Sequence, residues 1–394
     1  MADERDYLLR GPAPPIKPSR WTSIVIRGLL LTSGIIVFVI GVLKFGAFVQ
    51  PRPAYDVDLL SIPTATTTIA RSECKEDKST STLKVAYDIP FNTLFHYAYG
   101  QTKFEASDVT ILNDTVYAVC DNSWAIDKFA RHATPYSTEN ILLAPPPMMS
   151  NHLNRVEGDS GYEAIFDYDG VFYAVRESVN LHAIIVELSL TDDTYTYIQE
   201  CPCEYTFEGD NTGFEGAVGF PDKDGIMYVL GLCEGNYCRD KNKKSKDPGN
   251  GRVVLMKKRD VNLDANDIGC LWETVREVHI PKSAAFVDYS AIDITSNGRV
   301  AISSQESSSV WLGYVSGITD GVIDPKRFEF SDHDSSVLNF PRDKHCETIY
   351  CNVEGIHWIN DDMLLAVSDR IKDEGRQNRR CGVKDQSIHG FVLP

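Results

Sequence analysis

Five short segments of the sequence each open on a polar residue whose side-chain oxygen could coordinate a cation. These opening residues are Ser107, Glu163, Glu215, Ser290 and Glu354. Carboxylate and hydroxyl oxygens, without histidine or cysteine, form a ligand set that calcium and magnesium prefer. Three carboxylates held near one point repel one another unless a cation lies among them or some are protonated. The set therefore predicts a calcium site if the fold brings its members together; the alternative is a polar rim that only faces solvent.

A second set of acidic residues ends the same five segments. Its members are Asp121, Glu177, Glu234, Glu306 and Asp369, and two arginines, Arg176 and Arg370, lie beside two of them. Around a bound calcium, such carboxylates and arginines could polarise a phosphate ester and activate water, which makes them the candidate catalytic residues. The alternatives are solvated acids around a purely structural calcium, and a face that binds a polymer or a protein.

The elements that must position these residues are β-hairpins. Each segment contains two short apolar stretches separated by an Asx-Gly or Asx-Asx turn, which is a strong hairpin signal. Two further strand-like stretches follow most copies, so the repeating unit is predicted to be a four-stranded antiparallel blade. The five copies are ASDVTILNDTVYAVCD from Ala106, YEAIFDYDGVFYAVRE from Tyr162, FEGAVGFPDKDGIMYVLGLCE from Phe214, YSAIDITSNGRVAISSQE from Tyr289 and VEGIHWINDDMLLAVSD from Val353.

The last copy lacks an outer strand, because only SIHGFVLP follows it. The stretch Leu83–Pro90 (LKVAYDIP) resembles the outer-strand stretch EVHIP, so it is predicted to complete the last blade and leave no open edge. The expected fold is all-β: a five-bladed β-propeller over residues 81–394, with a sixth, divergent blade as the alternative. Because the first strands of propeller blades line the central channel, the first polar set should circle one mouth, with the second set around it. The width of such a ring favours calcium over magnesium.

The order Ser107, Glu163, Glu215, Ser290, Glu354 resembles that of the soluble calcium-activated nucleotidases, the apyrases of the secretory pathway. The Glu-Gly openings are also similar to those of phytase-like propellers. These resemblances imply a central calcium, an N-terminal membrane anchor, and hydrolysis of nucleoside diphosphates or other phosphate esters. The chain departs from the nucleotidases in AYDIPFN, where Asp88 is the only acid, and in the loop GLCEGNYCRDKNKKSK. A non-catalytic, calcium-stabilised binding or receptor propeller is therefore the alternative function.

The charge and the cysteines restrict the partners and the compartment. The net charge is −17, with the excess of acid after the N-terminal tail, and such a surface repels phosphate backbones, so nucleic acid is not expected as a partner. All ten cysteines lie after residue 70, which indicates disulfides in an oxidising compartment. Cys233 with Cys238, and Cys346 with Cys351, could each close a short loop. A zinc site is the alternative, but the paired CxxC motifs of zinc fingers are absent.

The N-terminal region predicts a membrane anchor. Residues 24–48 contain an uncharged apolar run flanked by Arg27 and Lys44, long enough to span a bilayer. The basic residues before it favour a cytosolic tail at 1–23, a stalk at 49–80 and a lumenal or extracellular domain at 81–394. The chain is then a single-pass type II membrane protein of the secretory or endosomal system (Golgi, endosome, lysosome or vacuole) or the cell surface. A cleaved signal peptide is the alternative.

Shorter motifs and single residues add four expectations. Glu4, Leu8 and Leu9 match an acidic dileucine sorting signal, which predicts adaptor binding to the tail. Asn113-Asp114-Thr115 is an N-glycosylation acceptor at a hairpin tip. No GxSxG, HExxH, P-loop or GxGxxG motif is present, so serine hydrolase, zinc protease and nucleotide-fold functions have no support. His357 shows no ligand spacing and is expected to be an ordinary strand or loop residue.

Overall fold

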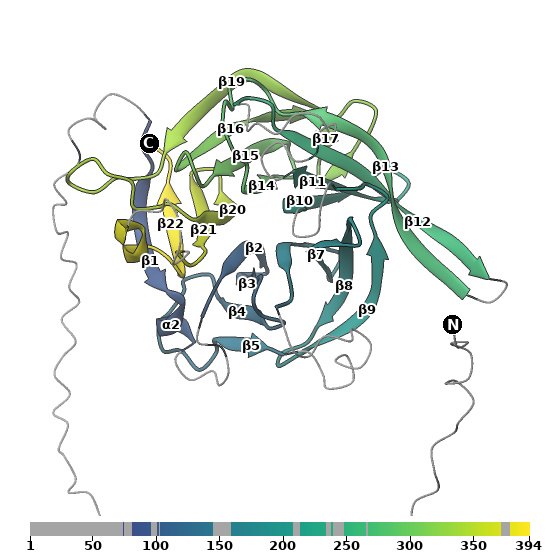
Figure 1. Cartoon of the computed structure of the whole chain (residues 1–394), viewed down its shortest axis with the longest axis horizontal. Coiled ribbons are helices and arrows are strands. Elements are labelled where there is room, and N and C mark those ends of the chain that lie inside the picture. Colours follow the sequence, from purple (N-terminus) through teal and green to yellow (C-terminus); the bar gives the residue numbers. More distant parts are fainter. Residues whose placement is uncertain are drawn as a thin grey trace, which may run out of the picture. The chain divides into compact units, whose positions relative to one another are not determined.

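The computed structural model describes residues 74, 81–95, 101, 103–144, 159–207, 213–233, 238, 248–264, 267–371 and 379–394. The chain divides into two compact units, Met1–Ile69 and Ala70–Pro394, and all the described residues lie in the second. They form five four-stranded antiparallel sheets around a central axis (Figure 1). The predicted all-β, five-bladed propeller is therefore confirmed.

Each blade has its first strand at the axis and its last strand at the outside (Figure 1). Blade 1 consists of β2 (Ala106–Leu112), β3 (Thr115–Cys120), β4 (Ile126–Ala130) and β5 (Ile141–Leu143). Blade 2 consists of β6 (Tyr162–Tyr168), β7 (Val171–Val179), β8 (His182–Leu190) and β9 (Tyr195–Pro202). Blade 3 consists of β10 (Phe214–Pro221), β11 (Met227–Cys233), β12 (Arg252–Asp264) and β13 (Asp267–His279).

Blade 4 consists of β14 (Ala291–Ile294), β15 (Arg299–Ser304), β16 (Ser309–Ser316) and β19 (Glu329–Asn339). A small hairpin of β17 (Ile318–Thr319) and β18 (Val322–Ile323) lies in the connection between its last two strands. Blade 5 consists of β20 (Val353–Asn360), β21 (Met363–Ser368), β22 (Ser387–Val392) and β1 (Lys84–Pro90). Two short helical elements, α2 (Phe91–Leu94) and η3 (Arg379–Val383), complete the described elements.

The backbone conformation of the turn residues determines how the two inner strands of a blade pair. In blade 1, Asn113 and Asp114 have φ values of 49° and 62°, and in blade 2, Asp169 and Gly170 have φ values of 51° and 77°. Two consecutive residues with positive φ form the turn whose twist matches that of the flanking strands. The two turns therefore set the register of β2 against β3 and of β6 against β7.

The propeller closes as the sequence predicted. Strand β1 pairs antiparallel with β22, from Lys84 opposite Val392 to Pro90 opposite Ser387. A buried polar group, here called the closure cluster, crosses the blade at this point: Asp88, Tyr350, Ser368, Lys384 and His389. Asp88 accepts hydrogen bonds from the Tyr350 hydroxyl at 3.0 Å and from Lys384, and its Oδ1 lies 2.8 Å from Nδ1 of His389. The N-terminal strand is thus held to the blade by side chains as well as by backbone pairing.

The core lies between neighbouring blades rather than at the axis. Five apolar clusters each join residues of two adjacent blades, as in Leu255 of blade 3 and Trp311 of blade 4. Each sheet packs against the two adjacent blades, one on each face. For this reason the second strands are apolar along nearly their whole length. Because hydrophobic burial occurs between the blades, the channel is left for polar residues.

Four disulfides are formed: Cys74–Cys346, Cys201–Cys270, Cys233–Cys238 and Cys351–Cys381. The predicted use of disulfides and the Cys233–Cys238 loop are confirmed, whereas the predicted Cys346–Cys351 loop is wrong. Cys346 lies at the tip of a turn closed by the Asp343 N–H and the Glu347 carbonyl, while Cys351 leads into β20, so the two reach different segments. Cys120 and Cys203 are buried thiols.

Several expectations concern residues outside those described. They are the cytosolic tail 1–23 with Glu4, Leu8 and Leu9, the membrane anchor 24–48, most of the stalk 49–80, and Glu234. Within the described part of the chain, no helix has the length and apolar character needed to cross a membrane.

Candidate functional site

The polar set that opens the five segments is here called the first ring, and the acid set that ends them is called the second ring. The first-ring residues occupy one equivalent position in the inner strands. In four blades the pairing of the first and second strands skips one residue, a β-bulge, and the skipped residues are Ser107, Glu163, Glu215 and Glu354. A bulge re-aims the side chain that it carries. In blade 4, β14 begins directly after Ser290, whose N–H donates to the Ser303 carbonyl at 3.0 Å. The repeat seen in the sequence is thus a repeat of backbone geometry at one end of the channel.

The glycines that follow two of these glutamates have a packing reason. A Cβ atom on Gly355 would lie 2.6 Å from Cα of Asp108, and a Cβ atom on Gly216 would lie 2.9 Å from the backbone nitrogen of Ile292. Backbone cannot move aside for a methyl group at such distances, so the inner strands of neighbouring blades approach this closely only at glycine. The Glu-Gly pair therefore combines close approach of the blades with an acid at the mouth.

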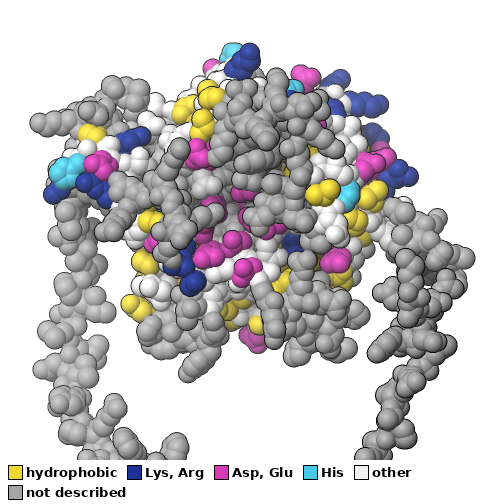
Figure 2. All heavy atoms as spheres, viewed as in Figure 1, with side chains coloured by type: hydrophobic (Ala, Val, Ile, Leu, Met, Phe, Trp, Pro, Cys, Tyr) yellow, Lys and Arg dark blue, Asp and Glu magenta, His cyan; other side chains and the backbone are white. Residues whose placement is uncertain are grey.

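Glu163 is the most deeply placed acid of the ring. Its side chain is 8% exposed, and its pKa is raised well above the ordinary value. The causes are burial first, then the charges of Glu215, Glu177, Glu354 and Asp121. The structure therefore brings three first-ring and two second-ring acids within electrostatic reach of one another. Figure 2 shows Asp and Glu side chains gathered over the centre of the propeller face.

The two serines of the ring are buried. The Ser290 hydroxyl donates to the Val353 carbonyl at 2.9 Å and lies 3.0 Å from the Ser303 hydroxyl. These contacts tie blade 4 to the start of β20. A hydroxyl that donates its proton keeps lone pairs on oxygen, so this geometry is compatible with coordination of a cation.

Asp121, an acid of the second ring, has a strongly perturbed pKa. Burial and the charges of Glu105, Asp159 and Glu177 raise its pKa to about 7. Its Oδ1 is buried and has no hydrogen-bond partner among the described residues. A cation close to this carboxyl group would stabilise its ionised form.

The remaining second-ring acids differ from one another. Asp369 is buried, and its N–H donates to the Asn352 carbonyl. Glu306 is exposed, and its N–H donates to Asp288. The second ring is therefore uneven: its acids around blades 1 and 2 act on Glu163, while the acid of blade 4 faces solvent.

The two candidate arginines are placed differently. Arg176 is 5% exposed; its Nε donates to the Ser160 carbonyl at 2.9 Å, and its guanidinium lies 4.9 Å from the centre of the Trp124 ring. Arg370 is half-buried and lies 3.7 Å from Glu105, the acid that most strongly raises the pKa of Asp121. Arg370 thus lies beside the acidic mouth, whereas Arg176 is held inside the blade packing.

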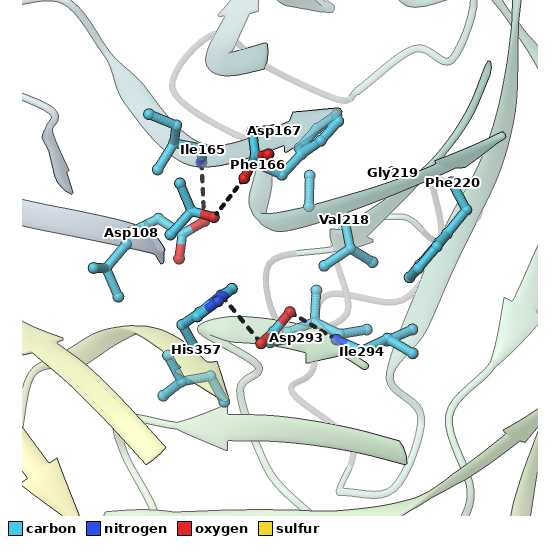
Figure 3. Close-up of a pocket in the computed structure, with 15 residues that line it drawn as sticks. Asp108, Ile165, Phe166, Asp167, Val218, Gly219, Phe220, Asp293, Ile294 and His357 are labelled. Carbon is cyan, nitrogen blue, oxygen red and sulfur yellow. Dashed lines mark hydrogen bonds and ion pairs between the residues drawn. The ribbon is translucent and has the colours of Figure 1, made fainter. Parts of the chain in front are cut away.

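Sequence reasoning missed a second group of polar residues, which lies further along the channel. Asp108, Asp167, Asp293 and His357 line a cavity of about 140 Å³ (Figure 3). His357 lies on β20 as a strand residue, as expected, but its Nδ1 is 3.2 Å from a carboxylate oxygen of Asp293. Polar residues in the middle of short apolar strands, as in ASDVTIL and GIHWI, were the signal that could have found them.

The closure cluster contains a Ser–His–Asp arrangement. The Ser368 hydroxyl lies 2.8 Å from Nε2 of His389, whose Nδ1 faces Asp88. These are the distances of a catalytic triad. However, Ser368 is 1% exposed and His389 is 0% exposed, so a substrate cannot reach the hydroxyl. We therefore assign this group to the structure of blade 5.

Two further observations concern the predicted sites. Asn113 is exposed at its hairpin tip, and its glycosylation stays a prediction. Among the described residues, no group of three or more His, Cys, Asp or Glu side chains is arranged as a ready metal site.

Comparisons with known proteins show only remote similarity. No protein-family model matches the chain, and no curated protein matches it. Similar solved structures include a luciferin-regenerating enzyme, at 9% identity over 78% of this chain and 94% of that chain, with a TM-score of 0.36. The WD40 repeats of RRP9 match at 10% identity over 82% and 99%, with a TM-score of 0.35. An exo-β-1,3-galactanase from Phanerochaete chrysosporium matches at 10% identity over 74% and 60%, with a TM-score of 0.37. At such scores these proteins carry no argument about function, and the five-bladed fold rests on the sheet topology.

Proposed function

We propose that this protein is a calcium-binding propeller whose acidic mouth becomes a recognition surface when the ion is bound. The observation that carries the proposal is the environment of Glu163, an acid whose pKa is raised by its burial and then by the charges of four neighbouring acids. Burying several like charges together is unfavourable, and a divalent cation among them removes that cost.

The chemistry of the oxygen donors at the mouth favours calcium. Glu163, Glu215 and Glu354 would supply carboxylate oxygens, and Ser107 and Ser290 would supply hydroxyl or carbonyl oxygens. Calcium accepts six to eight oxygens in variable geometry, whereas magnesium demands a strict octahedron. Glu215 and Glu354 are only half-buried, so calcium binding would draw these two side chains towards Glu163.

Recognition without catalysis is the first candidate use of the calcium-loaded mouth. A phosphohydrolase needs cations that face the phosphate group, but Arg176 is committed to Ser160 and Trp124 inside the blade packing. Calcium-dependent hydrolysis of nucleoside diphosphates or other phosphate esters is the second candidate. It is favoured by Arg370, which lies beside the acids of the mouth and could pair with a phosphate oxygen.

Membrane anchorage through residues 24–48 and a lumenal or extracellular propeller are part of the same proposal. The four disulfides support it, because such bonds persist in oxidising compartments. Adaptor binding to Glu4, Leu8 and Leu9 would then direct the protein within the endosomal system.

Calorimetric titration of the full chain with calcium tests the proposal. We expect binding that is lost in Glu163→Gln and kept in the matched control Glu139→Gln, because Glu139 is exposed and belongs to neither polar set. Equal binding by both variants would place the ion elsewhere and contradict the proposal.

Phosphate release from nucleotides and phosphate esters, measured with and without calcium, separates the two candidates. Calcium-dependent release that Arg370→Ala abolishes would establish the hydrolase. Calcium binding without release would establish recognition alone.

A further inference from the structure

The channel holds a second polar site, beyond the acidic mouth. The cavity of about 140 Å³ is lined by the inner strands of all five blades: β2, β6, β10, β14 and β20 (Figure 3). In blade 2 its lining runs from Ile165 to Asp167, two to four residues after Glu163. In blade 1 the lining begins at Asp108, directly after Ser107 of the ring. The cavity therefore adjoins the ring and extends from it along the channel, where it is lined by different side chains.

The polar wall of the cavity is held in place by the protein itself. Asp108 accepts the Ile165 N–H at 2.9 Å, and Asp293 accepts the Trp358 N–H at 2.7 Å, so each of these carboxylates bridges two blades. The Thr110 hydroxyl donates to Asp167 at 3.4 Å. Because these bonds fix the carboxylates before any ligand arrives, little ordering is needed on binding.

The wall formed by β10 has a different character. Its lining residues Ala217, Val218, Gly219 and Phe220 carry no polar side chain, and Figure 3 shows Val218 and Phe220 on the side away from Asp108. The acidic side chains come from β2, β6 and β14. Among the described residues that line the cavity there is no lysine or arginine, and the basic side chain there, His357, is paired with Asp293. The cavity thus offers carboxyl groups on one side and an apolar surface on the other.

The volume restricts what fits. A water molecule takes about 30 Å³ of liquid, and a protein cavity of about 150 Å³ holds benzene, a molecule of six heavy atoms. A cavity of about 140 Å³ is therefore larger than one bare metal ion needs and matches a compact organic molecule.

We propose that this cavity binds a small organic cation, an ammonium or guanidinium group on a short apolar body. The charged group would pair with the carboxylate of Asp167, and the apolar body would lie against Val218 and Phe220. This proposal goes beyond calcium binding at the mouth and does not depend on it.

Calorimetric titration of the full chain with methylguanidinium and n-propylammonium tests the proposal, with N-methylurea and 1-propanol as neutral counterparts. We expect each cation to bind at least about tenfold more tightly than its counterpart, the ratio that one charge-assisted hydrogen bond provides. Binding that is equal for cations and neutral molecules, or no cation binding at millimolar concentration, would overturn the proposal.

Variants locate the binding. Asp167→Asn should weaken cation binding about tenfold, whereas Asp169→Asn, an exposed acid two residues away on the same hairpin, should leave it unchanged. Val218→Phe should abolish binding by filling the cavity without altering its charge, and a cooperative thermal transition would show that this variant folds. If both variants bind like the wild type, the cation lies elsewhere.

The proposal of the calcium site and the proposal of the cavity site can be tested independently. Glu163→Gln should lose calcium binding and keep methylguanidinium binding. If Glu163→Gln loses methylguanidinium binding together with calcium binding, the cavity is not a separate site and the organic-cation proposal is wrong.

Discussion

The closure cluster of blade 5 and the acidic mouth both bury carboxylates, but they do so with opposite electrostatics. Burial raises the pKa of Asp88, yet the hydrogen bonds and charges of His389 and Lys384 outweigh burial and hold that pKa well below its usual range. At the mouth, burial and the charges of neighbouring acids both raise the pKa of Glu163. The same propeller therefore stabilises one buried carboxylate in its ionised form and disfavours ionisation of the other.

This difference separates structural residues from candidate functional ones. In the closure cluster each polar group has a partner within the cluster, so the group is complete and holds β1 in place. At the mouth the largest charge effects on Glu163 come from like charges, which an added cation would relieve. A buried acid next to other acids is thus a stronger indication of a ligand than a buried acid next to a cation.

The largest effect is expected from breaking the closure cluster. Asp88→Asn removes the negative charge that faces Lys384 and leaves a buried cation without its counter-charge. We expect the free energy of unfolding to fall by about 3 kcal/mol, as for other broken buried ion pairs. Urea denaturation followed by fluorescence measures it. Asp114→Asn, which removes an exposed partner of Arg131, is the control and should change stability by less than about 0.5 kcal/mol. Equal effects would contradict the structural role of the cluster.

The opposite sign is expected at the mouth. Glu163→Gln removes a buried acid from a group of like charges, so in calcium-free buffer at pH 8 it should raise the free energy of unfolding by about 1–2 kcal/mol. The same urea denaturation measures this change. A loss of stability would mean that the Glu163 carboxylate is held by favourable contacts, and the comparison with Asp88 would then fail.

A smaller effect is expected from pH. The pKa of Asp121 is raised to about 7 in the folded state, above its unfolded value near 4. The folded state therefore binds a proton first, and Asp121 adds stability as the pH falls from about 7 towards 4. Asp88 acts in the other direction, because its lowered pKa gives stability that is lost only below about pH 4.

The thermal unfolding midpoint, measured in calcium-free buffer between pH 8 and pH 5, checks this prediction. Relative to Asp121→Asn, the wild type should gain stability as the pH falls. A difference that does not vary with pH would show that the pKa of Asp121 is not raised.

Much of the fold could be predicted because its signals are local. Turn pairs such as Asn113-Asp114 and Asp169-Gly170 select the left-handed backbone of tight hairpins within a few residues. The closing strand is predictable because the last copy is one strand short, and a propeller without β1 would leave β22 as an open edge. The first ring was found because one bulge position repeats, which places Glu163, Glu215 and Glu354 in register along the sequence.

The elements of this protein follow from local sequence signals: five hairpin-based blades, an acid or serine at the head of each inner strand, and an even set of cysteines after residue 70. Which polar groups contact one another depends instead on the packing of the blades. Asp88 with His389, Asp293 with His357, and Cys346 with Cys74 are partners across long stretches of chain. The reason is physical: a hairpin is specified by its own few residues, whereas a side-chain contact between blades depends on how distant strands pack.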